Sequence, residues 1–237
     1  MRLCNTLNLA PPFDRNMKKQ SNAFGFRELS GFPTVIVANG EVPSSELSLR
    51  ILNDKKRIVC CDGALQKLLS VNIVPDVVVG DGDSMDNEEL LRHRIPYHAD
   101  KSEEYNDLQK ALKYCMANGY DNILLMGCGG LREDHFIANL SILAMYSERL
   151  HLAMLTEHGV FNVFRGSVTL ASIPGIQVSV FSRNPHTRLT FTGLKYPVNN
   201  RSFSWLWEGS LNEAMGEEFS VEAGNDEAVV VYRALGN

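Results

Sequence analysis

Short β-branched runs alternate with amphipathic stretches through the first two thirds of the chain. The stretches carry apolar residues at three- and four-residue spacing, which is typical of helices that pack on one face. This alternation predicts an α/β domain with a mainly parallel, Rossmann-like sheet and helices on both faces. We expect strands at 34–39, 58–61, 77–79, 95–97, 123–126 and 150–156, and helices at 44–52, 64–69, 87–94, 106–118 and 134–147.

The stretch at 106–118 carries the clearest helix signals. Asn106 is suited to the N-cap with Gln109 three residues later, and Gly119 suits the C-terminal end. A buried stripe is expected at Leu108, Ala111, Leu112, Cys115 and Met116.

Beyond residue 157 the pattern changes to short strands separated by turn residues, at 161–164, 167–173, 177–181, 188–192, 219–221 and 228–232. Such runs predict an all-β sandwich or barrel. The strand at 150–156 would then be the last strand of the first sheet. We expect a poorly ordered N-terminal extension at 1–30, an α/β domain at 31–157 and a β-sandwich domain at 158–237.

Composition narrows the function classes. The 237 residues carry a net charge of −5, which argues against a general nucleic-acid binder, because phosphate backbones are held by clustered Lys and Arg. A phosphate ligand would therefore need a metal. The cysteines are odd in number and lack C-x-x-C spacing, which indicates free thiols in a reducing cytosol. They are Cys4, Cys60, Cys61, Cys115 and Cys128.

Targeting signals are not evident. No apolar run approaches the length of about 18 residues that a membrane span requires, and residues 1–20 have no apolar core of a secretory signal. We therefore expect a cytoplasmic protein with no membrane or nucleic-acid partner. Met17, followed by two lysines, is a second candidate for the natural start of the protein, with residues 1–16 as an upstream extension.

An acidic loop follows the valine run at 77–79. In open α/β sheets, ligands bind beyond the carboxyl ends of the strands, where Asp81 and Asp83 fall. If the chain stays extended through Gly82, both carboxylates lie on one side and suit Mg²⁺. The alternative is a solvated turn, because Asp and Gly are ordinary turn formers.

Two further aspartates repeat this placement. Asp62 follows the strand at 58–61, so neighbouring strands would bring it to the same rim as Asp81. Asp107 opens the helix at 106–118, although a carboxylate there also interacts favourably with the helix dipole.

Glycines 127, 129 and 130 lie between a strand and the helix that begins at Asp134. Backbone N–H groups at such a loop can approach an anion, and Arg132 could add a bidentate phosphate contact. The loop is neither a Walker A sequence nor a dinucleotide fingerprint. His135 can equally be a packing residue at the helix start. No nucleophile–base arrangement or zinc cluster can be read from the residue order, so the combination suggests Mg²⁺-nucleotide chemistry.

Short motifs occur in order along most of the chain, at 62–64, 75–76, 80–84, 104–108, 130–135, 193–197 and 210–213. In order and spacing they resemble the motifs of the thiamine pyrophosphokinase family. This chain departs from the family pattern at single positions, where other residues are usual or a residue is inserted. The departures are Ala64, Gly82, Glu104, Asn106, Leu131 and the inserted Leu211.

The resemblance implies an α/β domain followed by a β-sandwich, and a homodimer with active sites between subunits. It implies Mg²⁺-dependent transfer of a diphosphate from ATP to the hydroxyl of thiamine, with release of AMP. Asp62, Asp81, Asp83 and Asp107 would hold or orient Mg²⁺ and the ATP phosphates. Asp134 would help to position thiamine or the metal, and it completes a catalytic set of Asp81, Asp83, Asp107 and Asp134.

The other site residues implied are those of the phosphate loop and the thiamine contacts. They are Gly63, Gly130, Arg132, His135, Ser210 and Asn212. Trp207 is a candidate to stack on thiamine; the alternative is that Trp205 and Trp207 belong to the sandwich core or a dimer interface.

Other functions remain open at this point. One is a Mg²⁺-dependent pyrophosphokinase for another small hydroxymethyl substrate, such as a hydroxymethyl-pterin. Another is a non-catalytic regulator that binds thiamine or a nucleotide on the same fold. A phosphatase with an Asp nucleophile is disfavoured, because Asp81-Gly82-Asp83 lacks the Gly-Thr that usually follows such a pair.

Overall fold

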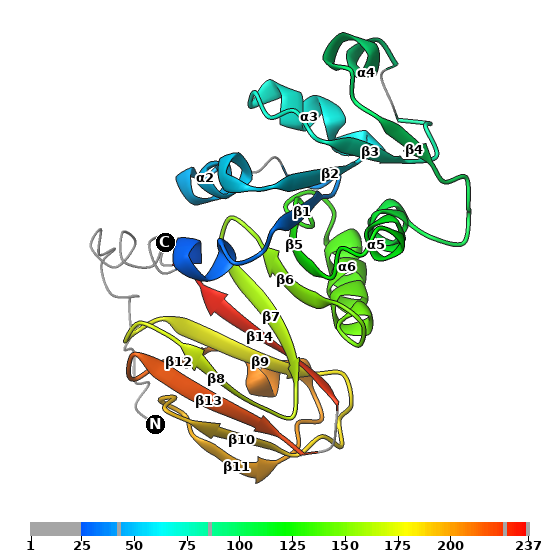
Figure 1. Cartoon of the computed structure of the whole chain (residues 1–237). Coiled ribbons are helices and arrows are strands. Elements are labelled where there is room, and N and C mark those ends of the chain that lie inside the picture. The colour runs from blue at the N-terminus through cyan, green and yellow to red at the C-terminus, as the bar shows by residue number, and fades with distance from the viewer. Residues whose placement is uncertain (1–24, 42–43, 85–86, 225–226, 236–237) are drawn as a thin grey trace, which may run out of the picture.

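One ten-stranded sheet passes through both halves of the chain (Figure 1). The computed structural model describes residues 25–41, 44–84, 87–224 and 227–235. The strand order in this sheet is β12-β9-β14-β7-β6-β5-β1-β2-β3-β4.

The N-terminal part of the sheet is parallel, as predicted, because β6-β5-β1-β2-β3-β4 pair in the same direction. Its central strands are buried on both faces, which suits their continuous β-branched and leucine-rich sequences. The bounds are β1 (Thr34–Val37), β2 (Arg57–Cys61), β3 (Val77–Gly80), β4 (Tyr97–Ala99), β5 (Asn122–Met126) and β6 (His151–Leu155).

Helices cover both faces of this parallel part, which confirms the α/β prediction. Apolar residues of α2 and α3 pack into one core and those of α5 and α6 into another. The predicted capping box is present, since the Asn106 side chain accepts from the Gln109 N–H and the Gln109 side chain from the Asn106 N–H. The bounds are α2 (Glu46–Asp54), η1 (Asp62–Ala64), α3 (Leu65–Ser70), α4 (Asn87–His93), α5 (Asp107–Ala117) and α6 (Glu133–Tyr146).

The direction of winding reverses next to β1. Strands β1 to β4 follow one another toward one edge, and the chain then crosses back through α5 to place β5 on the other side of β1. Such a reversal is a topological switch point, where the loops that leave two neighbouring strands diverge and open a crevice for ligands. The loops after β1 and β5 therefore form the expected binding region.

The strand at 150–156 is not the last strand of the first sheet, contrary to the prediction. Strand β6 turns at Glu157 and His158 into the antiparallel strand β7, and Thr156 closes this hairpin through hydrogen bonds with Gly159. The sheet continues through β7 (Gly159–Arg165), β14 (Ala228–Ala234), β9 (Gln177–Ser182) and β12 (Asn212–Glu213). The turn residues that we read as a domain boundary thus join neighbouring strands; the predicted domain limits stay a prediction.

The C-terminal part is antiparallel β structure, as expected. A second sheet with the order β11-β10-β13-β8 packs on the extension of the first, and the third core lies between them, with valines of β9 and β14 facing Phe191 and Phe219. The bounds are β8 (Ser167–Ala171), β10 (Leu189–Thr192), β11 (Val198–Arg201), η2 (Leu206–Gly209) and β13 (Glu218–Ala223). Strands β11 and β12 were not predicted, because they are short and polar.

The N-terminal extension differs from the expectation where it is described. Residues 25–29 form a helical turn, Leu29 is fully buried, and Glu28 pairs with Arg233 at 2.5 Å. Residues 25–30 are therefore packed against the rest of the chain. Met17, Cys4 and the rest of residues 1–24 lie outside the described part.

Four cysteines lie in the described part, and all four are free and buried. Burial raises the pKa of Cys115 and of Cys128 to about 12, which makes their thiols poor nucleophiles. Among the described helices, no helix is both long and apolar enough to cross a membrane.

Candidate functional site

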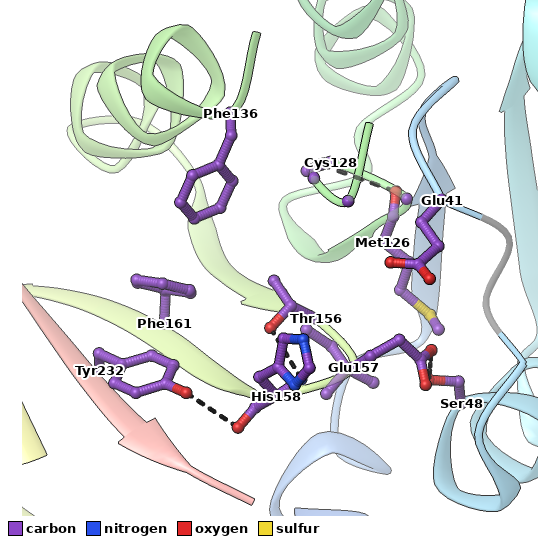
Figure 2. A pocket seen from close by; sticks show the side chains of 14 residues that line it. Glu41, Ser48, Met126, Cys128, Phe136, Thr156, Glu157, His158, Phe161 and Tyr232 are labelled. Carbon is purple, nitrogen blue, oxygen red and sulfur yellow. Dashed lines mark hydrogen bonds between the residues drawn. The ribbon is translucent and has the colours of Figure 1, made fainter. Parts of the chain in front are cut away.

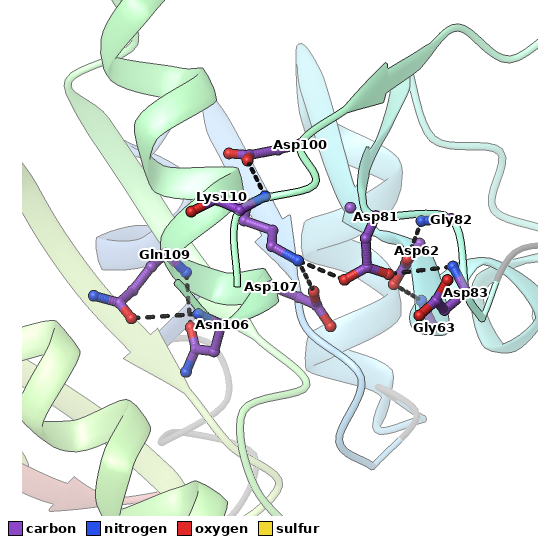
Figure 3. A network of polar contacts seen from close by, with 12 residues as sticks. Asp62, Gly63, Asp81, Gly82, Asp83, Asp100, Asn106, Asp107, Gln109 and Lys110 are labelled. Atoms are coloured by element: carbon purple, nitrogen blue, oxygen red, sulfur yellow. Dashed lines mark hydrogen bonds and ion pairs between the residues drawn. The ribbon is translucent and has the colours of Figure 1, made fainter. Parts of the chain in front are cut away.

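Three aspartates meet at the carboxyl ends of β2 and β3 and the start of α5 (Figure 3). We call Asp62, Asp81 and Asp107 the acidic rim. Two of them converge on Lys110, whose Nζ lies 2.6 Å from Asp81 Oδ2 and 3.3 Å from Asp107 Oδ1. The Lys110 side chain is only 3% exposed, so the fold places a buried ammonium between two carboxylates.

Lys110 was missed in the sequence analysis. It lies in the buried stripe of α5, where a lysine is rarely found unless it is paired. An Asp three residues earlier on the same helix is a spacing that brings opposite charges together. The pair of Asp107 and Lys110 on one predicted helix was the sequence signal that pointed to a buried, paired lysine.

The charges of this pair shift both titrations. The hydrogen bond from Lys110 lowers the pKa of Asp81. Burial alone would lower the pKa of Lys110, but its hydrogen bonds and charge interactions with Asp81 and Asp107 outweigh burial and raise it. Both groups are therefore held in their charged forms at neutral pH.

Asp62 is the most buried carboxylate of the rim, at 2% exposure. It accepts hydrogen bonds from the N–H groups of Gly63 at 2.6 Å and Gly82 at 3.1 Å. Burial raises the pKa of Asp62, the two N–H groups oppose this, and the charges of Asp107 and Asp81 add to it. The three carboxylates are thus close enough to repel one another, and the ammonium group of Lys110 offsets part of that repulsion at Asp81 and Asp107.

The acidic loop turns rather than staying extended. Gly82 has a positive φ of 92°, and the Asp83 N–H donates to Asp81 Oδ1 at 3.2 Å. The condition that the chain stays extended through Gly82 is therefore not met, because a glycine permits the turn and Asp81 caps it. The alternative of a turn is the one that the structure shows. Asp83 is exposed next to the rim.

Within the described residues, no three or more His, Cys, Asp or Glu side chains form a group that could hold a metal ion. Lys110 fills the space between Asp81 and Asp107. The predicted ligand set of Asp62, Asp81, Asp83 and Asp107 accordingly stays a prediction.

A cavity of about 430 Å³ opens at the switch point, and we call it the switch-point crevice. Its walls come from the loops after β1 and β5 and from the starts of α5 and α6. The two loops are joined by backbone hydrogen bonds, from Gly40 to Gly127 at 2.6 Å and from Glu41 to Gly129 at 2.7 Å. This brings Asn39, Asp107, Arg132 and His135 to one crevice.

Arg132 and Asp134 form an exposed bidentate ion pair at the start of α6, with distances of 2.6 and 3.1 Å. The hydrogen bond and charge of Asp134 raise the pKa of Arg132, and Arg132 in turn lowers the pKa of Asp134. Of these two residues, only Arg132 lines the switch-point crevice. The fold therefore brings the predicted site residues Arg132 and Asp134 together, and they form an ion pair with each other.

A second cavity, of about 300 Å³, is lined by the same glycine loop and by the turn between β6 and β7 (Figure 2). We call it the aromatic cavity, because Phe136, Phe161 and Tyr232 line it. The ring centroids of Phe136 and Phe161 are 5.7 Å apart, and those of Phe161 and Tyr232 are 4.8 Å apart. Gly130 also lines it, with a φ of +85° and Glu41 so close that a Cβ at Gly130 would collide with it.

The polar side chains of the aromatic cavity include two carboxylates, together with Ser48, His158 and the hydroxyl of Tyr232. Glu41, Glu157 and the hydroxyl of Thr156 line it, and Glu157 is fixed by hydrogen bonds from the Ser44 N–H and the Ser48 hydroxyl. Carboxylates beside aromatic rings suit a flat ring that carries hydrogen-bond donors or a positive charge, and they disfavour phosphate.

The predicted thiamine contacts lie in the C-terminal part, around η2. Trp205 and Trp207 are 69% and 72% exposed, so the alternative that they belong to the sandwich core is wrong. Trp207 lines a cavity of about 450 Å³ together with Ser210 and Asn212. This cavity shares no lining residue with the switch-point crevice or the aromatic cavity.

The side chains of Ser210 and Asn212 form hydrogen bonds with neighbouring residues of the C-terminal part. The Ser210 hydroxyl donates to the Trp207 carbonyl at 2.7 Å. Asn212 is buried, its Oδ1 accepts from the N–H groups of Tyr196 and Glu213, and its Nδ2 donates to the Tyr196 carbonyl. The inserted Leu211 is exposed with a positive φ of 60°, so the insertion is accommodated by a strained backbone turn.

Comparison with protein-family models gives two matches in sequence order. Residues 49–154 match the model described as thiamin pyrophosphokinase, catalytic domain, and residues 159–232 match thiamin pyrophosphokinase, substrate-binding domain. Together the two matches cover most of the chain.

Among curated proteins, the thiamine pyrophosphokinase of Bacillus subtilis (strain 168) is 30% identical over 153 residues, which span 56% of this chain and 66% of that protein. Among solved structures, a thiamine pyrophosphokinase from Bacillus subtilis is similar with a TM-score of 0.72 and 20% identity, over 85% of this chain and 98% of that one. The solved structure of the Candida albicans thiamin pyrophosphokinase is similar with a TM-score of 0.72 and 17% identity, over 87% of this chain and 90% of that one. At such identities these structural similarities establish the fold.

Proposed function

Because this chain belongs to the thiamin pyrophosphokinase family, we propose that it transfers the diphosphate group of ATP to the hydroxyl of thiamine, which gives thiamine diphosphate and AMP. The observation that carries this proposal is the match of both the catalytic and the substrate-binding model, in order, along one chain. The substrate-binding match over 159–232 favours thiamine over another hydroxymethyl substrate.

The acidic rim supports a requirement for Mg²⁺. The support is the chemistry of the donors, since the side-chain oxygens of the rim are all carboxylate oxygens, which suit Mg²⁺. Asp62, Asp81 and Asp107, with Asp83 in the same turn as Asp81, would hold the ion. Bound Mg²⁺ would neutralise charge on the ATP phosphates.

Lys110 holds the orientation of Asp81 and Asp107 and brings a fixed positive charge to the rim. A charge fixed before the substrate arrives stabilises developing negative charge without reorganisation. We assign Lys110 the role of positioning these two carboxylates during diphosphate transfer.

On the crevice side, Arg132 would contact a phosphate oxygen, with His135 beside it in the crevice lining. The roles of Gly63 and Gly130, which do not line the crevice, stay predictions. Its ion pair with Asp134 keeps the guanidinium at the mouth of the switch-point crevice. Because the pair is exposed, exchange of Asp134 for a phosphate costs little. Asp134 would then be free to position thiamine.

Trp207 would stack on thiamine, with Ser210 and Asn212 shaping its surroundings. These residues line a cavity separate from the acidic rim. A site built from both regions would need a second copy of the chain, so this separation supports a homodimer with active sites between subunits. We place the enzyme in the cytoplasm, in accordance with its free, buried thiols.

The test is incubation of the protein with ATP, Mg²⁺ and thiamine, followed by chromatography of the nucleotides and thiamine species. Equal amounts of AMP and thiamine diphosphate are expected, with the yield lost in Asp81→Asn. Asp121→Asn is the matched control, because Asp121 is exposed and precedes β5, at the opposite end of the parallel strands from the rim.

Other products would contradict the proposal. ADP with thiamine monophosphate would identify an ordinary kinase. Binding of thiamine without turnover would identify a regulator.

A further inference from the structure

The side-chain amide of Asn39 is fixed in one orientation. Lys67 Nζ donates to Asn39 Oδ1 at 2.6 Å, to the Asn39 carbonyl at 2.8 Å and to the Gly40 carbonyl at 2.8 Å. An ammonium group only donates, so the amide oxygen must face Lys67 and Nδ2 must face the other way. The positions of Oδ1 and Nδ2 in the Asn39 amide are therefore set by the ammonium group of Lys67.

The opposite side of the amide lies over Gly63. A Cβ built at Gly63 would lie 2.2 Å from Asn39 Nδ2, so only glycine leaves room for the amide next to Asp62. No residue in the described part of the chain accepts a hydrogen bond from this Nδ2. Asn39 is exposed and lines the switch-point crevice with Arg132 and His135.

We propose that Asn39 binds the nucleotide by donating from Nδ2 to an oxygen of ATP, and that Lys67 is the positioning residue that aims this donor. The acceptor is a phosphate oxygen or a ribose hydroxyl, which share the same hydrogen-bond chemistry. Lys67 does not contact the nucleotide itself, because its three N–H groups are directed at the loop after β1. The inference rests on the proposed function, since it takes ATP as the ligand of the crevice.

The position of Asn39 favours binding of a ligand, and not only stabilisation of the loop after β1. The loop after β1 forms one wall of the switch point, where nucleotides bind in sheets of this kind. A small number of placed polar groups fixes a ligand in such a pocket. Gly63 is explained by the same contact, because the close approach of the Asn39 amide excludes any side chain there.

The experiment measures steady-state kinetics for ATP and thiamine, and the Kd of Mg²⁺-ATP without thiamine by calorimetry. Asn39→Ala removes the donor, Asn39→Asp keeps the Lys67 contact but replaces the donor by an anionic oxygen, and Lys67→Met releases the amide. Lys55→Met is the matched control, since Lys55 also caps a main-chain carbonyl, that of Leu29, and lines neither crevice nor rim.

Loss of a hydrogen bond to a charged or polar ligand oxygen predicts about a tenfold rise in Kd and in the KM for ATP for Asn39→Ala. Asn39→Asp should be weaker still, and Lys67→Met intermediate. The kcat and the KM for thiamine should stay close to those of the natural protein, and Lys55→Met should match it throughout. A merely structural role of Asn39 would lower the melting temperature without this selective effect on ATP.

Inorganic tripolyphosphate with Mg²⁺ distinguishes the two acceptors. If Asn39→Ala weakens tripolyphosphate and ATP equally, the acceptor is a phosphate oxygen; if it weakens only ATP, the acceptor lies on the ribose. Unchanged ATP affinity in Asn39→Ala would overturn the inference even if thiamine diphosphate is formed. Weakened ATP binding in a protein that makes no thiamine diphosphate would instead overturn the proposed function and leave this inference standing.

Discussion

The acidic rim and the aromatic cavity are built in different ways. The rim takes its residues from the first and last positions of elements, such as Asp62 at the end of β2 and Asp107 at the start of α5. The aromatic cavity takes Phe136 from a helix and Phe161 and Tyr232 from two paired strands. The rim is polar and partly exposed, whereas the cavity is continuous with a hydrophobic core.

The two regions therefore differ in whether their residues contribute mainly to activity or mainly to the stability of the fold. Rim residues contribute charges and not apolar contacts to the cores, so we expect their replacement to lower activity more than stability. Residues around the aromatic cavity hold β6, β7 and β14 together through α6, so their replacement should lower stability first. The following variants test this contrast between the two regions.

The largest effect is expected for Lys110→Met. It removes the cation that orients Asp81 and Asp107 while keeping the side-chain length. Loss of a fixed charge next to transferring phosphates predicts a fall in kcat of about 100- to 1000-fold. The measurement is the rate of AMP formation at saturating ATP and thiamine.

Lys113→Met is the matched control for Lys110→Met, because Lys113 is exposed on the same helix and lies 3.6 Å from the ring centre of Tyr105. Its kcat should be unchanged. Equal activity of Lys110→Met and the natural protein would show that the rim works without its lysine.

The next effect is on stability. Phe161→Ala empties a site that is 6% exposed between Phe136 and Tyr232, which predicts a loss of about 3–5 kcal/mol in the free energy of unfolding. Urea unfolding with an unchanged slope measures it. A loss below about 1 kcal/mol would mean that the cavity is not part of the core.

A smaller effect is expected in the pH dependence of stability. Lys110 lowers the pKa of Asp81 below its ordinary value of 3.8, so this carboxylate stabilises the fold above that value and the contribution is lost as pH falls through the lowered pKa. The pKa of Lys110 is raised above 10.5, so its contribution is complete below 10.5 and is lost as pH rises through the raised value.

The stability difference between the natural protein and Lys110→Met should therefore be constant between about pH 5 and 9 and shrink on either side. Urea midpoints of both proteins, measured from about pH 2 to pH 11, test this. A difference that persists unchanged at pH 2 would contradict the assigned ion pair.

The smallest effect concerns the exposed aromatic residues. Trp207→Ala should raise the KM for thiamine several-fold, as loss of a stacking contact with a cationic ring predicts, without a change in melting temperature because the side chain is largely exposed. Trp205→Ala, at similar exposure, is the comparison. If Trp207→Ala leaves the KM for thiamine unchanged, its stacking role is excluded.

Much of the parallel sheet could be predicted because its signals are local. β-branched runs predicted β1, β2 and β3, and the box at Asn106 and Gln109 fixed the start of α5. Position at a strand end was enough to nominate Asp62 and Asp81, since parallel strands deliver their carboxyl ends to one edge.

Other features needed the tertiary structure. Lys110 gains its role only because α5 packs against β3 and brings its side chain to Asp81, 29 positions away. Tyr232 joins Phe161 through pairing of β14 with β7. Asn39 meets Gly63 and Lys67 only because β1 lies beside β2.

Most of the elements, the acidic loops and the family could be read from the amino-acid order, because short-range periodicity and ordered motifs do not depend on distant contacts. Only the tertiary structure decided that the sheet continues through the turn at Glu157 and His158, that Gly82 turns the acidic loop, and that a buried lysine joins the rim. The physical reason is that strand pairing and burial bring together residues far apart in the chain, and sequence spacing does not encode which of them meet.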